Sequence, residues 1–158
     1  MGNIFSGSEI VGIGVQIEKN GRDFYNTLAL GSKIEKDRDM FKFLAGEEEK
    51  HIVVFQGILN QTAEYVPLES YPGEYFEYMN ALAGEYVFTQ KDKGVEIAKS
   101  ILSDAEAIEL GIGFEKDSII FYEGMKKVIP GYDFVIINQL IEQEQNHLKM
   151  LTELKHSI

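Results

Sequence analysis

The chain has 158 residues, 44% of them apolar, and a net charge of −11 at pH 7. These values predict one globular domain over residues 1–158 and argue against nucleic acid or an anionic membrane as a partner. The chain contains no cysteine, so disulfides, a thiolate nucleophile, cysteine-ligated zinc and iron–sulfur clusters are excluded. No apolar run is long enough to span a membrane, and no positive side chain precedes Lys19, so we expect no signal peptide and a cytoplasmic protein.

The first predicted helix begins at Ser6, which forms a capping box with Glu9, and ends near Leu30, before Gly31. Its core-facing residues at helical spacing are Val11, Gly14, Glu18, Gly21, Tyr25 and Leu28. The glycines at positions 12, 14 and 21 each lower helix propensity by up to about 1 kcal/mol. They indicate either close approach of a neighbouring helix or metal-bound ligand, or simply a weak helix.

The second predicted helix runs from about Lys33 to Thr62, with Ser32 and Glu35 as its capping box. Because the turn before it is so short, it must lie antiparallel to the first helix. Its core-facing residues are Phe41, Leu44, Glu48, His51, Phe55 and Ile58. The glutamate and the histidine stand where leucine is usual, and a buried glutamate is costly unless it is paired or holds a metal. For this motif alone, a core histidine bonded to its own glutamate is the alternative to a ligand pair.

The helical pattern breaks between Ala63 and Asp92, a stretch that contains Pro67, Pro72 and several tyrosines. We expect this long connection to carry the chain across the bundle, with a short helix inside it. A second short amphipathic helix is predicted from Gly94 to Leu102. The tyrosines suit either a dimer interface or a substrate channel.

Two more long helices follow. The third opens with a capping box of Ser103 and Glu106. Its inner face consists of Ile108, Gly111, Glu115, Ser118, Tyr122 and Met125. The fourth begins near Pro130, a residue suited to a first helical turn, and continues to the C-terminus. Its core-facing residues are Ile137, Leu140, Glu144, His147, Leu151 and Leu154.

All three histidines follow a glutamate by three residues, so this spacing alone does not select ligands. Helical phase separates them. His156 lies nine residues after His147, which is about two and a half turns at roughly 3.6 residues per turn. We therefore expect Glu153 and His156 on the opposite, solvated face.

The second half of the chain repeats the first, which predicts two copies of one helical pair. The matched residues, at shifts of 96 or 97, are Glu18 with Glu115, Tyr25 with Tyr122, Glu48 with Glu144, and His51 with His147. One inward Glu from each of two helices and a Glu-x-x-His from each of the other two is the side-chain set of a two-metal carboxylate site in a four-helix bundle. Residues three apart share a helix face, so each such Glu and His converge on one ion.

On these four segments the chain resembles the rubrerythrin-like branch of the ferritin-like diiron-carboxylate proteins. The resemblance implies an all-α fold, an antiparallel four-helix bundle with a long crossover from the second helix to the third that contains short helices. It implies two iron ions, with manganese or zinc as substitutes, held by Glu18, Glu48, His51, Glu115, Glu144 and His147. It places Tyr25 and Tyr122 beside the site as hydrogen-bonding or radical-quenching groups, although both fit ordinary core tyrosines equally well.

The chain departs from rubrerythrins in two respects. Rubrerythrins end in a rubredoxin-like domain that binds iron through four cysteines, which this chain lacks, so electrons would come from a separate donor such as a rubredoxin-like protein. They also carry a second carboxylate one turn after the ligand of the third long helix, used when iron shifts between ligands during peroxide reduction. Ser118 occupies that position here, so the resemblance supports metal binding more directly than peroxidase activity.

Three functions are compatible with the sequence. The leading hypothesis is a di-iron oxidoreductase, a homodimer that reduces peroxide or dioxygen. The alternative is a protein that binds, stores or delivers iron without turnover. A metal-free helical interaction module is the third, and it would leave four buried glutamates without a counter-charge, at several kcal/mol per ion.

Overall fold

The computed structural model describes residues 7–61, 73–85, 87–127, 129 and 133–157. Its long helices are α1 (Gly7–Gly31), α2 (Glu35–Gln61), α5 (Asp104–Met125) and α6 (Phe134–His156). Between α2 and α5 lie α3 (Gly73–Glu85), a short 3-10 helix η1 (Val87–Thr89) and α4 (Lys93–Lys99). The described residues contain no strand, which confirms the predicted all-α class.

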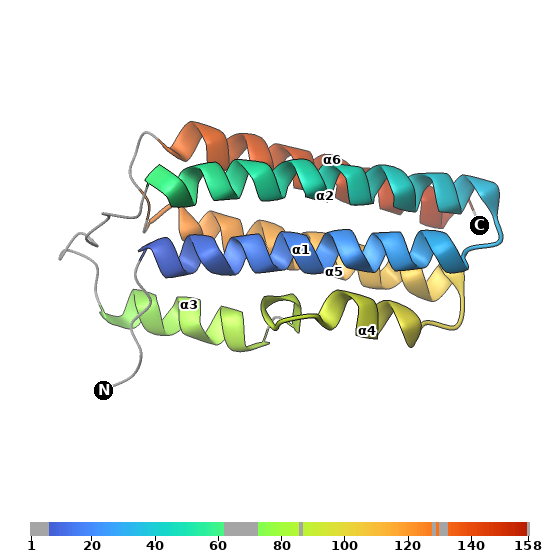
Figure 1. The fold of residues 1–158 in the computed structure, drawn as a ribbon, viewed down its shortest axis with the longest axis horizontal. Coiled ribbons are helices and arrows are strands. Elements are labelled where there is room, and N and C mark those ends of the chain that lie inside the picture. Colours follow the sequence, from blue (N-terminus) through green and yellow to red (C-terminus); the bar gives the residue numbers. More distant parts are fainter. Residues whose placement is uncertain (1–6, 62–72, 86, 128, 130–132, 158) are drawn as a thin grey trace.

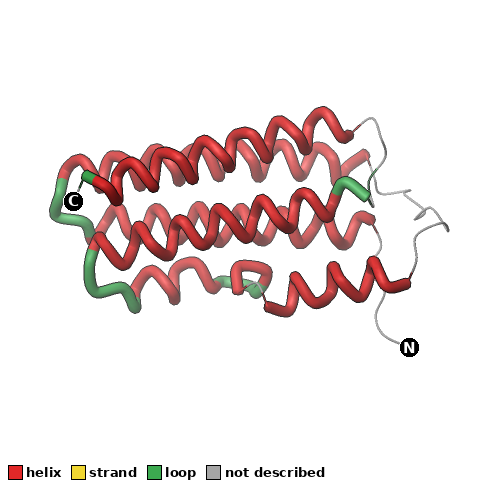
Figure 2. Tube along the Cα trace, turned by 180° about the vertical axis from the view of Figure 1, so that it is seen from behind, coloured by secondary structure: helices red, strands yellow, loops and turns green. Residues whose placement is uncertain are grey.

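The four long helices form a bundle, and the crossover runs along one side of it. Helix α1 packs against α2, and α5 packs against α6 (Figure 1). Helices α3 and α4 lie in line beneath α1 and α5, and the view from behind shows the same arrangement (Figure 2). The crossover helices therefore cover the α1 and α5 side of the bundle, and no described helix covers the α2 and α6 side.

Among the described helix boundaries, the start of α2 departs from expectation. Helix α2 begins at Glu35 instead of Lys33, because the Ser32 hydroxyl lies 2.8 Å from Asp104 Oδ2 and 3.3 Å from the Ile34 carbonyl and does not cap the helix. Helix α6 begins at Phe134, with Asp133 as its N-cap. The predicted cap at Ser6, the end at Thr62 and the start at Pro130 fall outside the described residues, as do Pro67 and Pro72.

The third predicted capping box is present at the start of α5. Ser103 has an extended backbone, and its hydroxyl accepts a hydrogen bond from the Glu106 amide at 3.1 Å. The Glu106 carboxylate in turn accepts from the Leu102 amide at 3.1 Å. Two of the unpaired amides at this helix end are thus satisfied, which sets where α5 begins.

The core consists of the four apolar stripes that helical spacing predicts. Every position assigned to an inner face of the four long helices is buried. The glycines differ among themselves. A Cβ at Gly21 would lie 2.4 Å from Phe114 Cζ and one at Gly14 would lie 3.0 Å from Met125 Cε, whereas Gly12 has nothing within 4 Å. Close approach therefore explains Gly14 and Gly21 but not Gly12.

Asn20 attaches the crossover to the bundle. Its buried side-chain amide donates hydrogen bonds to the carbonyls of Phe88 and Gln90, each at 2.6 Å, and its Oδ1 accepts from the Gly94 amide at 3.0 Å. A Cβ at Gly94 would lie 2.0 Å from the Asn20 carbonyl oxygen, so only glycine fits there. Asn20 of α1 thus contributes three hydrogen bonds between the bundle and the crossover.

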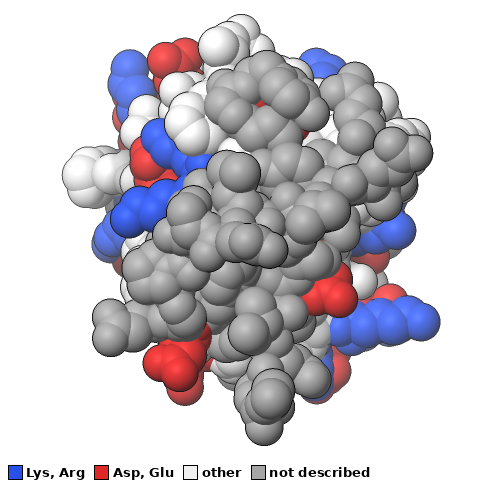
Figure 3. All heavy atoms as spheres, turned by 90° about the vertical axis from the view of Figure 1, so that its left-hand side faces the viewer, with Lys and Arg blue, Asp and Glu red and all other residues white. Residues whose placement is uncertain are grey.

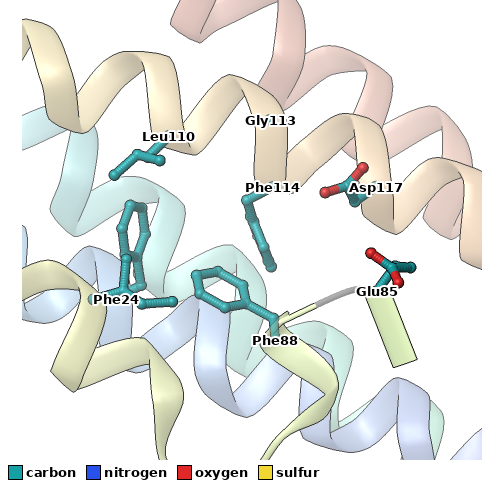
Figure 4. A pocket seen from close by; sticks show the side chains of 8 residues that line it. Phe24, Glu85, Phe88, Leu110, Gly113, Phe114 and Asp117 are labelled. Atoms are coloured by element: carbon teal, nitrogen blue, oxygen red, sulfur yellow. The ribbon is translucent and has the colours of Figure 1, made fainter. Parts of the chain in front are cut away.

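A pocket of about 180 Å³ lies between the crossover and the bundle (Figure 4). The rings of Phe24, Phe88 and Phe114 form one wall, with Phe88 and Phe114 centroids 4.6 Å apart. Glu85 and Asp117 lie at the other end of the pocket. None of the six predicted metal ligands lines this pocket.

The surface carries charges of both signs. At the bundle end that faces the viewer in Figure 3, the described Lys and Arg side chains alternate with Asp and Glu around the rim. Within the described residues, no helix combines the length and apolar character needed to cross a membrane.

Candidate metal centre

Six polar side chains meet in the middle of the bundle. Glu18, Glu48, Glu115 and Glu144 are 0% exposed, and His51 and His147 are 1% and 2% exposed. They come from all four long helices, and each occupies an inward position of its helix. The structure therefore brings together all six residues that the sequence singled out.

The six residues form two overlapping groups. One consists of Glu18, Glu48, His51 and Glu144, and the other of Glu48, Glu115, Glu144 and His147. Within each group, one ligand atom from every residue lies within 4.8 Å of the others. The groups share Glu48 and Glu144, so two carboxylates belong to both groups.

Each histidine turns its Nδ1 toward the carboxylates. His51 Nδ1 lies 2.8 Å from Glu144 Oε1 and 3.3 Å from Glu18 Oε2. His147 Nδ1 lies 3.4 Å from Glu48 Oε1 and 3.5 Å from Glu144 Oε2. The two imidazole rings are nearly parallel, with centroids 5.6 Å apart and an interplanar angle of 14°. Both rings thus present the same nitrogen to the centre of the cluster.

Polar atoms of the cluster are left without hydrogen bonds. Among the described residues, the buried atoms with no hydrogen-bond partner include Glu18 Oε2, both oxygens of Glu48 and of Glu144, Glu115 Oε2, and Nδ1 of both histidines. Buried polar groups nearly always have a hydrogen-bond partner, so this many unpaired atoms in one place indicates that the cluster binds a further group. Carboxylate oxygen and imidazole nitrogen are ligands that suit iron, manganese or zinc, and the donor set fits two such ions.

Burial and mutual repulsion shift the pKa values of the carboxyls. Burial, reinforced by the charge of Glu18, raises the pKa of Glu48 to about 8. Burial and the charge of Glu144 raise the pKa of Glu115 well above its usual value. For Glu18, burial is the largest single effect and acts in the same direction, but the charge of His51 together with contacts to Glu48, His51 and Tyr122 outweighs it, and the pKa is lowered. Without metal, the cluster therefore retains protons that a cation would displace.

The histidines are shifted upward against the effect of burial. Burial lowers the pKa of His147, but the nearby carboxylates of Glu115, Glu144 and Glu48 raise it to about 12. The pKa of His51 is also raised, because the charge of Glu18 and contacts with the carboxylates of Glu144, Glu18 and Glu48 together outweigh burial, the largest single effect. In the metal-free protein, protonated histidines thus supply the positive charge that the carboxylates require.

Two tyrosines cross-link the halves of the cluster. Tyr25 of α1 donates its hydroxyl hydrogen to Glu115 Oε1 on α5 at 2.7 Å. Tyr122 of α5 donates in the same way to Glu18 Oε1 on α1. Each tyrosine therefore holds one of the two carboxylates that the groups do not share. Burial and the charge of Glu115 raise the pKa of Tyr25 well above its usual value, so its hydroxyl stays protonated.

The third Glu-x-x-His motif lies outside the cluster. Glu153 and His156 are both exposed, as their helical phase predicted. Ser118, one turn after Glu115, is buried on the inner face of α5, so the described cluster has no further carboxylate at that position.

One neighbour of the cluster was missed by sequence reasoning. Gln143 Oε1 lies 2.6 Å from His51 Nε2, the ring nitrogen that faces away from the carboxylates. The internal repeat could have indicated this residue, because Gln143 and Glu47 occupy matching positions, each immediately before a glutamate of the cluster. A surface pocket of about 320 Å³ on the α2 and α6 side reaches His147 and is also lined by Glu47 and Gln143.

Comparisons with known proteins agree with this geometry. The family model described as Rubrerythrin matches residues 9–155. A crystal structure of a protein from Thermotoga maritima, described as a ferritin-like diiron-carboxylate protein, superposes with a TM-score of 0.68 and 25% sequence identity. The match covers 99% of this chain and 98% of the Thermotoga protein. A comparison with curated proteins found no match.

Proposed function

The chain belongs to the rubrerythrin family, and from that premise we propose that its buried cluster holds two iron ions and reduces peroxide or dioxygen. The observation that carries the proposal is the pair of overlapping four-residue groups that share Glu48 and Glu144. A cluster of this composition is able to bind metal, because its carboxylates and imidazoles converge from four helices. Four carboxylate charges balance two divalent cations, which removes the cost of burying them.

We assign a role to each of the six side chains. Glu48 and Glu144 belong to both groups and would serve as ligands to either ion. Glu18 and His51 would complete one subsite. Glu115 and His147 would complete the other. In this assignment each group offers one imidazole, one carboxylate of its own and two shared carboxylates, which together would hold one ion.

The bound metals would supply the two electrons that break an O–O bond. The protein side chains provide the surroundings for that chemistry. Tyr25 and Tyr122 hold the unshared carboxylates in place as neutral donors, and we propose both as hydrogen-bonding or radical-quenching groups. Peroxide reduction to water also consumes two protons.

Electrons for turnover would come from a separate protein. The chain has no cysteine, so it has no rubredoxin-type iron site of its own. We propose a small redox protein of the rubredoxin kind as the donor. The pocket that reaches His147 lies on the side of the bundle that no described crossover helix covers, which suits it as the approach to the cluster.

Iron content is the first test of the proposal. Protein expressed with added iron and purified without oxygen should contain about two irons per chain. His51→Ala and Glu144→Ala should each lower that content. His156→Ala is the matched control, because His156 has the same spacing to a glutamate but is exposed, and it should leave the iron unchanged. Two irons retained in both cluster variants would overturn the ligand assignment.

Reaction with peroxide separates an enzyme from a storage protein. The reduced, iron-loaded protein should be oxidised by hydrogen peroxide in a stopped-flow experiment and should turn over when a reductant is supplied. A homodimer on size-exclusion chromatography is expected. Two bound irons without turnover, in an assembly of many subunits, would instead support an iron-storage or delivery protein.

A further inference from the structure

We propose that Glu47 and Gln143 are positioning residues for the two histidines, and that their difference in charge makes the two metal subsites unequal. This inference rests on the proposed two-metal site and concerns how that site is divided. The inference predicts that the subsite of His147 binds metal more tightly than the subsite of His51.

The contact of His51 with Gln143 is the first observation. His51 directs Nδ1 toward the carboxylates and Nε2 toward Gln143 Oε1, 2.6 Å away. A carbonyl oxygen only accepts, so this contact requires the hydrogen on Nε2. A metal that displaces the hydrogen on Nδ1 then meets the form of histidine that binds metals, with its lone pair on Nδ1. Gln143 thereby selects both the tautomer and the ring orientation of His51.

The internal duplication extends this relation to His147. The shift of 96 residues that carries His51 onto His147 also carries Glu47 onto Gln143. Because α2 and α6 exchange places under this repeat, the counterpart of the contact between His51 and Gln143 is one between His147 and Glu47. Glu47 and His147 line the same pocket on the α2 and α6 side of the bundle. Glu47 is therefore the residue placed to accept from the outer nitrogen of His147.

The duplication is broken at these outer positions. All four matched pairs in the cluster are identical, namely both unshared glutamates, both tyrosines, both shared glutamates and both histidines. At the outer positions, Glu47 and Lys50 in the first half become Gln143 and Asn146 in the second. Lys50 Nζ donates to Glu47 Oε1 at 2.8 Å, which leaves Oε2 of the same carboxylate for another donor. The first half of the chain thus carries a charged pair at the two positions where the second half carries two neutral amides.

The difference has a direct chemical consequence. A histidine that donates to a carboxylate is a more basic metal ligand than one that donates to an amide, because the anion draws the hydrogen away from the ring. Loss of such an outer partner typically costs about 10- to 100-fold in metal affinity. With equal inner ligands, the subsite of His147 is expected to fill first and that of His51 second.

Stepwise titration of the metal-free protein with Co²⁺ tests the inference. Wild-type protein should bind two Co²⁺ in steps separated by about tenfold or more. Glu47→Gln should weaken the tight step by about tenfold, so that the two steps merge. Gln143→Glu should tighten the weak step. The double exchange, Glu47→Gln with Gln143→Glu, should separate the steps again, a recovery that a merely structural role would not give.

Histidine ring nitrogen NMR of the Zn²⁺-loaded protein identifies which ligand responds. Glu47→Gln should move the outer N–H resonance of His147 and leave that of His51, whereas Gln143→Glu should do the reverse. Glu49→Gln is the matched control, because Glu49 is an exposed acid beside Glu48 that pairs with Arg22. It should leave both binding steps and both resonances unchanged.

The outcomes separate this inference from the proposed function. Wild-type protein that binds no Co²⁺ would overturn both. Two bound Co²⁺ with both steps within twofold of wild type in Glu47→Gln would overturn the inference alone, as would an equal effect of Glu49→Gln. Gln143 is exposed, so Gln143→Glu is expected to fold. If Glu47→Gln does not fold, Gln143→Glu alone still tests the inference.

Discussion

At the scale of single residues, the cluster holds its charges in an arrangement that only a cation or protons can balance. Burial and the charge of Glu18 raise the pKa of Glu48 to about 8, while the neighbouring carboxylates raise the pKa of His147 to about 12. The metal-free site therefore retains protons at neutral pH that an unfolded chain would release. Metal binding must displace these protons.

The metal-free protein is expected to lose stability as the pH rises from about 6 to about 9. Glu48 has a folded-state pKa of about 8 against a usual value of 4.5, so between these values the folded state binds a proton that the unfolded state has lost. His147 contributes in the same direction above its usual 6.5, up to about 12. Glu18, whose pKa is lowered, acts in the opposite direction only below 4.5. Urea unfolding with a chelator present measures this decline.

Glu48→Gln provides the control for this pH dependence. The amide has nearly the same shape and does not titrate, so the decline in unfolding free energy with pH should be smaller in the variant. A free energy of unfolding that rises with pH over the same range would contradict the assignment of the bound protons.

At the scale of elements, close packing decides how α1 meets its neighbours. Phe114 of α5 fills the space beside Gly21, and its ring meets Tyr25 edge-on with centroids 5.9 Å apart. Tyr25 in turn holds Glu115. The glycine in α1 thus sets the position of a ring that supports the cluster.

Gly21→Ala is expected to destabilise the protein by about 1–3 kcal/mol despite the better helix propensity of alanine. The added Cβ would lie 2.4 Å from Phe114 Cζ, so the ring must move. Gly12→Ala is the matched control in the same helix, because nothing lies within 4 Å of its Cβ, and it should stabilise by up to about 1 kcal/mol. Chemical denaturation measures the change in the free energy of unfolding for both variants. Changes of the same sign in the two variants would contradict the packing argument.

The crossover depends on Asn20. Asn20→Ala should cost about 2 kcal/mol or more, because two carbonyls and the Gly94 amide lose their partners. Hydrogen exchange at the Gly94 amide should become faster in this variant. Asn26→Ala, at an exposed position of the same helix, should change neither stability nor exchange. Unchanged protection of Gly94 in Asn20→Ala would show that other contacts hold the crossover.

At the scale of the whole molecule, all four long helices contribute to one buried polar centre. Their apolar stripes would pack as a bundle by themselves, but the cluster places four glutamates in the core. An unpaired buried carboxylate costs several kcal/mol, so the bundle is expected to be most stable with metal bound.

Metal loading is therefore expected to raise the unfolding temperature. A ligand at a hundredfold excess over its dissociation constant adds about 2.7 kcal/mol per site, provided that it binds only the folded state. Differential scanning calorimetry with Fe²⁺ under nitrogen, with and without chelator, measures the shift. His51→Ala should show a smaller shift, while His156→Ala should match the wild type. An identical unfolding temperature with and without metal would contradict a structural contribution of the ions.

Sequence alone determined which side chains meet at the centre of the bundle. Helical spacing is a local property, so a phase counted along one helix places Glu48 and His51 inward and His156 outward without knowledge of the other helices. The duplication then supplied the second half of the cluster. The family and the all-α class followed from the same residues, whereas metal ligation by each of them stays a prediction.

Only the tertiary structure decided the contacts between helices. The bonds of Tyr25 to Glu115, His51 to Gln143 and Asn20 to the crossover join residues about 70 to 90 positions apart, and no periodicity in one segment specifies its partner in another. The start of α2 was missed for a similar reason, because Ser32 interacts with Asp104 instead of capping its own helix. A side chain forms the hydrogen bond that the folded environment offers, and that environment is assembled from distant parts of the chain.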